Sequence, residues 1–137
     1  MKLRKVAAMV ILAGMSVTQV SGNTGVWAKG NYTDTSFAKK YNGDGSDYYT
    51  SSRAKQNTTA SYVNNNGSDT HQITAAVSNG SYKICSSYYT IKAGNRKYIK
   101  NQVYQKGGRS ARIAMAPSSG KKVMMRGVWS PDNCSGY

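Results

Sequence analysis

Glycine-containing turn signals recur along the second half of the chain at nearly equal spacing. They fall at Gly67, Gly80, Gly94, Gly107 and Gly120, with successive gaps of 13, 14, 13 and 13 residues. The runs between them are rich in Tyr, Val, Ile and Thr, which favour β-strands over helices. These runs do not resemble one another, so the spacing is not an internal sequence repeat. It predicts an all-β fold, a single antiparallel β sandwich or barrel domain.

Apolar residues alternate with polar ones in several of these runs, as they do in strands with one buried face. After Ser86 and Ser87 the alternation changes phase, so that Tyr89 and Ile91 face inward, which predicts a bulge at the two serines. Thr58–Val63 is predicted to be a strand despite a helix-like start before it, because of its β-branched residues. Pro131 is predicted to end the last strand, since proline cannot donate to a ladder. The inward positions predicted by alternation are Ile73, Ala75, Val77, Ala111, Ile113, Met115, Val123 and Met125.

The segment from Arg96 to Lys106 combines strand alternation with positive charge and tyrosine. Ile99 and Val103 share one face, which we predict to be buried. The other face then carries a row of basic and aromatic residues, to which Arg112 of the following strand adds a further charge. Such a row either binds an anionic partner, with tyrosine rings stacking on sugars or bases, or only solubilises the protein. The candidate binding residues are Arg96, Tyr98, Lys100, Tyr104, Lys106 and Arg112.

The first residues have the pattern of a secretory signal peptide. Residues 1–5 carry three positive charges, and residues 6–17 form an apolar run that is shorter than the ~20 residues of a membrane-spanning helix. Cleavage could follow Gly22 or Ala28. We favour Ala28, because Val26 and Ala28 place small residues at the two positions that signal peptidase recognises. The alternative is an uncleaved anchor, although no other segment of the chain is a transmembrane candidate.

Cleavage after Ala28 leaves residues 29–137 as one small domain with its own core. This domain keeps 16 Lys and Arg residues against five Asp and no Glu, a net charge of +11. Such a charge favours an anionic partner: a cell-wall polymer, a glycan or an anionic membrane surface, with nucleic acid as a less favoured choice. The alternative is that the charge only keeps a secreted or cell-surface protein soluble.

Cys85 and Cys134 are the two cysteines of the chain. In an exported protein an even cysteine count favours a disulfide. Closing the loop between these positions would stabilise the fold by about 4 kcal/mol on a chain-entropy model. A metal site is a poor alternative, because His71 is the single histidine and carboxylates are scarce.

The sequence offers little for catalysis. General acid–base chemistry needs a tuned histidine or a carboxylate pair, and His71 is more simply explained as a residue at the start of a strand. Asp44 and Asp47 in a glycine-rich loop suggest a plain turn rather than a calcium loop, since further oxygen ligands are missing. We therefore expect a protein that is not an enzyme and that uses no cofactor or metal.

Segments along the chain carry a family resemblance: "WAKGNYTDTSF", "SSRAKQNTTASYV", "YIKNQVYQKGG", "ARIAM" and "GVWSPD". Together they resemble an uncharacterised family of small exported Firmicutes proteins over residues 27–132, a family with no known catalytic residues. Asn64 and Gln105 depart from that family's pattern. In size, export and composition the chain is more distantly similar to the lactococcin-972-like bacteriocins, small exported β proteins that act on cell-wall synthesis.

These observations predict a secreted, non-catalytic basic protein that binds an anionic cell-envelope or glycan partner. One alternative is a bacteriocin-like antimicrobial protein that acts on the envelope of competing bacteria. The other is a wall-associated structural or adhesion protein.

Overall fold

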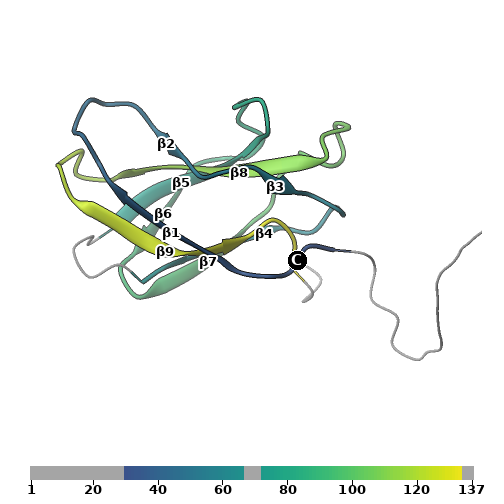
Figure 1. Ribbon diagram of the computed structural model, residues 1–137, viewed down its shortest axis with the longest axis horizontal. Coiled ribbons are helices and arrows are strands. Elements are labelled where there is room, and N and C mark those ends of the chain that lie inside the picture. The colour runs from purple at the N-terminus through teal and green to yellow at the C-terminus, as the bar shows by residue number, and fades with distance from the viewer. Residues whose placement is uncertain (1–29, 67–71, 134–137) are drawn as a thin grey trace, which may run out of the picture.

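The computed structural model describes residues 30–66 and 72–133, and in these residues the fold is all-β (Figure 1). The predicted signal peptide (1–28), His71 and Cys134 lie outside the described residues. None of the described residues forms a helix of the length and apolar character that a membrane crossing needs. The strands are β1 (Thr35–Lys40), β2 (Tyr48–Tyr49), β3 (Arg53–Ala54), β4 (Ser61–Asn65), β5 (Gln72–Asn79), β6 (Tyr89–Lys92), β7 (Asn95–Ile99), β8 (Ser110–Pro117) and β9 (Met124–Ser130).

The strands form two antiparallel sheets that lie face to face as two layers (Figure 1). Sheet A has the order β1-β9-β4-β7, and sheet B has the order β2-β8-β5-β6, with β3 also paired to β8. The prediction of an antiparallel β sandwich is therefore confirmed. The chain passes from sheet B to sheet A between β6 and β7, where Gly94 adopts a φ of 84° that residues with a Cβ rarely tolerate.

The alternating apolar residues of the two sheets form one core between the layers. Trp129 is 1 % exposed and contributes the largest buried side chain. The predicted inward positions of β5 and β8 are all fully buried, as the alternation required. These positions are Ile73, Ala75, Val77, Ala111, Ile113 and Met115.

Both edge strands of sheet A carry a lysine at an inward-facing position. Lys39 of β1 lies over the ring of Tyr48 in β2, with Nζ 5.6 Å from the ring centroid. Lys97 of β7 lies over the ring of Tyr89 in β6, at 4.9 Å. Each lysine therefore caps the end of the core with a cation–π contact between the two sheets. An inward-pointing charge on an edge strand also opposes pairing with another chain.

The predicted strand from Arg96 to Lys106 is wrong in its second half, because β7 ends at Ile99. The physical reason is the side chain of Asn101, which makes hydrogen bonds that compete with a ladder. Its Nδ2 donates to the Ile99 carbonyl at 3.0 Å, and its Oδ1 accepts from the Val103 N–H at 3.3 Å. Such local side-chain bonds favour turns over strands. Ile99 and Val103 are buried as predicted, but a turn follows Asn101.

The predicted strand over 58–63 starts later than expected, since β4 begins at Ser61. The side chain of Asn57 accepts a hydrogen bond from the Thr59 N–H at 2.9 Å, which holds residues 57–59 in a turn. The expected end of the last strand is correct, because β9 stops at Ser130, immediately before Pro131.

Sheet A depends on a glycine at an inward position of β9. A Cβ built at Gly127 would lie 2.0 Å from the Asn64 carbonyl oxygen and 2.7 Å from Cζ of Phe37. We expect Gly127→Ala to lower the free energy of unfolding by about 1–3 kcal/mol, because neither the backbone nor the packed ring can yield cheaply. Urea unfolding measures this change. The control Ser36→Ala, at an exposed position of β1, should stay within about 0.5 kcal/mol of the parent. Equal urea midpoints for the parent, Gly127→Ala and Ser36→Ala would contradict this account of the packing around Gly127.

Candidate anion-binding groove

A groove of about 520 Å³ opens beside the turn that follows β7. Two segments far apart in the sequence form its walls: residues 84–87, and residues 100–106 of the turn. They are joined where the Gln102 N–H donates to the Cys85 carbonyl at 2.9 Å. The early end of β7 makes this arrangement possible, since a continued strand would not turn back toward residue 85. The lining residues are Ile84, Cys85, Ser86, Ser87, Tyr89, Lys100, Asn101, Gln102, Gln105 and Lys106.

The groove is basic and rich in hydrogen-bond donors. Lys100 and Lys106 are both exposed and line it, and none of its ten lining residues is acidic. The exposed side chains of Ser87, Gln102 and Gln105 supply neutral donors beside the two ammonium groups. Lys97 lies above the ring of Tyr89, itself a lining residue, and adds a third positive charge nearby. Ammonium groups with adjacent neutral donors suit phosphate or carboxylate oxygens.

Only part of the predicted binding row lies here. Lys100 and Lys106 line the groove, whereas Arg96 and Tyr98 belong to the outer face of sheet A, where Tyr98 pairs with Tyr62 of β4. The six predicted residues therefore do not form one continuous surface. The row predicted for a single long strand is wrong, because the chain changes direction after Ile99.

Tyr104 lies in the turn, where it contacts Arg109 rather than the other predicted residues. The Arg109 guanidinium carbon lies 3.7 Å from the centroid of the Tyr104 ring, and Nη1 donates to the Tyr104 carbonyl at 3.1 Å. This stacked pair closes the turn.

Arg112 belongs to β8 and lies on the outer face of sheet B, whereas Arg96 and Tyr98 lie on sheet A. Its Nε donates to the Gly80 carbonyl at 3.1 Å and its Nη1 to the Thr50 carbonyl at 3.0 Å. The guanidinium also covers the ring of Tyr82 at 4.3 Å. Tyr82 has a φ of 67°, unusual for a residue with a side chain, and its side chain is 54 % exposed. Arg112 thus holds an exposed ring in place.

Two acidic residues of the glycine-rich loop make local contacts. The Asp44 carboxylate accepts from the Ser46 N–H at 3.0 Å, the geometry of a side-chain turn. Asp47 accepts from the hydroxyl of Tyr88 at 2.9 Å. Burial first, and then this bond to the Asp47 carboxylate, raises the pKa of Tyr88 to about 12. At neutral pH the phenol is therefore a donor that anchors this loop.

Cys85 is half-buried at the wall of the groove, with Sγ 3.4 Å from the Lys83 carbonyl oxygen. Its predicted partner, Cys134, lies outside the described residues, so the disulfide stays a prediction.

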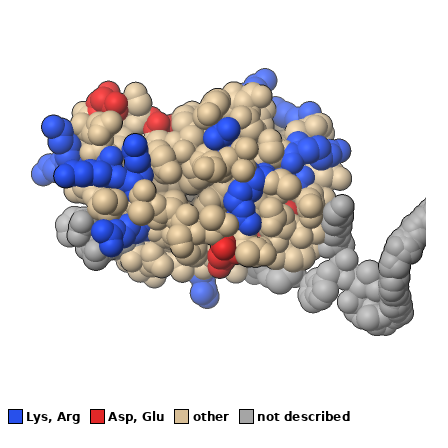
Figure 2. All heavy atoms as spheres, viewed as in Figure 1, with Lys and Arg blue, Asp and Glu red and all other residues tan. Residues whose placement is uncertain are grey.

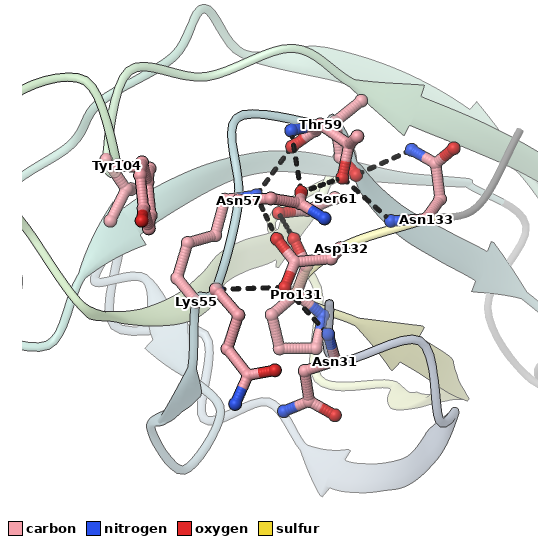
Figure 3. A network of polar contacts seen from close by, with 12 residues as sticks. Asn31, Lys55, Asn57, Thr59, Ser61, Tyr104, Pro131, Asp132 and Asn133 are labelled. Carbon is pink, nitrogen blue, oxygen red and sulfur yellow. Dashed lines mark hydrogen bonds and ion pairs between the residues drawn. The ribbon is translucent and has the colours of Figure 1, made fainter. Parts of the chain in front are cut away.

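Sequence reasoning missed a buried ion pair between Lys55 and Asp132. Lys55 Nζ lies 2.6 Å from Asp132 Oδ1, both side chains are fully buried, and Nζ also donates to the Thr59 carbonyl at 2.5 Å. The second carboxylate oxygen accepts from the backbone N–H groups of Asn31 and Gln56, each at 2.9 Å. Figure 3 shows the labelled side chains of this network gathered around Asp132. A single carboxylate therefore joins residues 31, 55–56 and 132.

Burial has a measurable effect on the lysine of this pair. It lowers the pKa of Lys55, and the hydrogen bond and charge of Asp132 oppose that shift. Since desolvating both ions is costly, the additional hydrogen bonds to both groups are needed to offset the cost.

The chain around Asp132 is fixed by further polar contacts. The Ser61 hydroxyl donates to the Pro131 carbonyl at 2.8 Å. The side-chain amide of Asn133 donates to the Ala60 carbonyl at 2.7 Å. Residues 130–133 are thus held tightly against the start of β4.

No spacing signal pointed to this pair, because 77 positions separate the two residues. The one available hint was the family resemblance, since Lys55 lies in "RAKQNTTASY" and Asp132 ends "GVWSPD".

Comparison with known proteins gives one positive result. A family model described as "Protein of unknown function (DUF2712)" matches residues 24–133. No curated protein and no solved structure matches the chain.

The buried pair predicts strongly non-additive mutations. We expect Lys55→Met and Asp132→Asn each to lower the free energy of unfolding by about 3–5 kcal/mol, because each leaves one side of the buried pair without its partner. The double variant should cost less than the sum, since neither charge is then present. Urea unfolding of the four proteins gives the coupling energy. The exposed Lys122→Met serves as a control and should change stability little. Additive losses would show that the two side chains do not stabilise each other.

Proposed function

We propose a function for this chain on the basis of its own residues. The chain belongs to the DUF2712 family, which is a family of proteins of unknown function. It is a secreted, non-catalytic basic protein that binds an anionic polymer of the cell envelope. The binding site is the groove that contains Lys100 and Lys106.

The observation that carries this proposal is the composition of the groove. Two exposed lysines line it together with the exposed side chains of Ser87, Gln102 and Gln105, and no carboxylate is among its lining residues. A repeating polymer of phosphate or carboxylate groups can lie along such an open site and contact both ammonium groups. Lys97 is close enough, above Tyr89, to contribute to the local positive potential.

The charge balance of the domain supports an anionic partner. Residues 30–66 and 72–133 contain 15 Lys and Arg residues and four Asp residues. Among these residues the Lys55–Asp132 pair is the one salt bridge, and it is buried. The surface is therefore left with a large positive excess, and on the face in Figure 2 blue side chains gather at both ends of the sandwich. Such a field speeds association with polyanions.

The groove favours binding over catalysis. Cys85 is its one lining residue with a thiol, and covalent catalysis at a thiol usually relies on a neighbouring general base. Neither a histidine nor a carboxylate is among the lining residues. Its lysines and amides are donors that hold anions.

The test is the salt dependence of binding to purified glycerol-phosphate teichoic acid. We expect Lys100→Gln/Lys106→Gln to weaken binding and to make the slope of log K against log salt shallower, by about one for each lost phosphate contact. The matched control is Lys121→Gln/Lys122→Gln, which removes the same charge beyond the other end of β8. Equal effects of the two double variants would mean that only the overall field matters, and that the groove is not the site.

Export and the disulfide are tested by one intact-mass measurement on protein from the culture medium. We expect the mass of residues 29–137 less two hydrogens, because cleavage follows Ala28 and Cys85 pairs with Cys134 within one chain. Reduction should restore the two hydrogens without changing the number of chains. A mass that includes Met1 would contradict the signal peptide, and alkylation of both cysteines without reduction would contradict the disulfide.

A further inference from the structure

The outer face of sheet A carries a row of side chains that runs across its strands. The backbone register places Ser130 of β9 opposite Tyr62 of β4, and Tyr62 opposite Tyr98 of β7. Asp34, one residue before β1, continues the row on the other side of Ser130. Residues in such a row share one face of a sheet, so their side chains lie next to one another.

A cleft of about 190 Å³ lies along this row. Its rim carries Tyr32, Asp34, Tyr62 and Tyr98, and the small side chain of Ser130 leaves the hollow between them. The rings of Tyr62 and Tyr98 are 5.3 Å apart between centroids and are tilted by 45°. The rim of the cleft thus combines three phenol rings with one carboxylate, while the carboxylate of Asp132 is buried below.

We propose that this cleft binds one pyranose ring of a neutral sugar chain. Tyrosine rings pack against the apolar C–H face of a sugar, while their hydroxyls stay at the wet rim. A carboxylate such as that of Asp34 accepts hydrogen bonds from sugar hydroxyls. The volume is below that of a site for a drug-sized ligand and suits a single ring of a longer chain that extends into solvent.

The charges around the cleft favour a neutral ligand over an ion. Asp34 at the rim opposes an anion, which separates this cleft from the lysine groove. Arg53 opposes a cation, since its Nη2 donates to the carbonyl of Thr33, the residue next to Asp34, at 2.7 Å. The two sites share no lining residue, so the sugar site does not depend on the function proposed for the groove.

The floor and the rim of the cleft are held in place before any ligand arrives. The floor residues Ser130, Asp132 and Asn133 are buried, and Asp132 is fixed by its ion pair with Lys55. The Asp132 N–H also donates to the Asn31 carbonyl at 3.2 Å, which ties the segment carrying Tyr32 and Asp34 to the floor. A preformed site loses little conformational freedom when it binds.

The experiment is titration calorimetry of the domain with two neutral probes, chitohexaose and cellohexaose. We expect at least one hexamer to bind with little salt dependence, and Tyr98→Ala to weaken that binding about tenfold or more, since a stacking ring is lost. Asp34→Asn, at an exposed position that does not threaten folding, should weaken it severalfold. The control Tyr82→Ala removes a more exposed tyrosine from the outer face of sheet B and should bind like the parent.

Several results would overturn the assignment. These are failure of both hexamers to bind, parent-like binding by Tyr98→Ala and Asp34→Asn, or loss of hexamer binding in Lys100→Gln/Lys106→Gln, which would move the sugar to the groove. Single-stranded DNA that binds through Tyr98 while neither hexamer binds would assign the rings to bases instead. Failure of teichoic acid binding alone would leave this cleft intact and would remove only the function proposed for the groove.

Discussion

The buried pair of Lys55 and Asp132 is the interaction that organises this small domain. Two ions lie out of water at 2.6 Å, and they are tolerated because backbone groups of Asn31, Gln56 and Thr59 complete their hydrogen bonds. The pair therefore does more than add stability, since it fixes which segments meet at this end of the sandwich. The cleft on sheet A lies over the same residues, so the costly interior contact also shapes a surface site.

The two candidate sites differ in the chemistry of the side chains that line them. The groove gathers lysines and neutral donors without an acid, whereas the cleft gathers tyrosines around an acid. Few carboxylates are available in the described domain, and Asp132 is already used in the interior. Positive charge on the surface therefore stays largely uncompensated, except near Asp34 and near the loop that carries Asp44 and Asp47. A polymer with both sugar and phosphate units could be recognised by two distinct chemistries on one domain.

The fold was predictable because it follows from local signals. Turn glycines and two-residue alternation, seen in Ile73, Ala75 and Val77, report directly on strands with one buried face. The predicted strand over Arg96–Lys106 is wrong because hydrogen bonds from the side chain of Asn101 replace those of a strand ladder. Alternation of apolar and polar residues does not reveal such side-chain bonds. Neither the ion pair nor the cleft could be found, since both arise from strand register between distant segments. The sequence feature on which the proposed function rests is the net positive charge of the chain.

The position of β9 has a consequence for how the chain reaches its native state. This strand lies between β1 and β4, although it is made after every other described strand. Until β9 has been synthesised, β1 and β4 lack the strand that lies between them in sheet A. The contact between residues 31 and 132 spans 101 positions. Such non-local pairing makes folding slow. The native order of sheet A therefore forms only after nearly all of the domain has been synthesised.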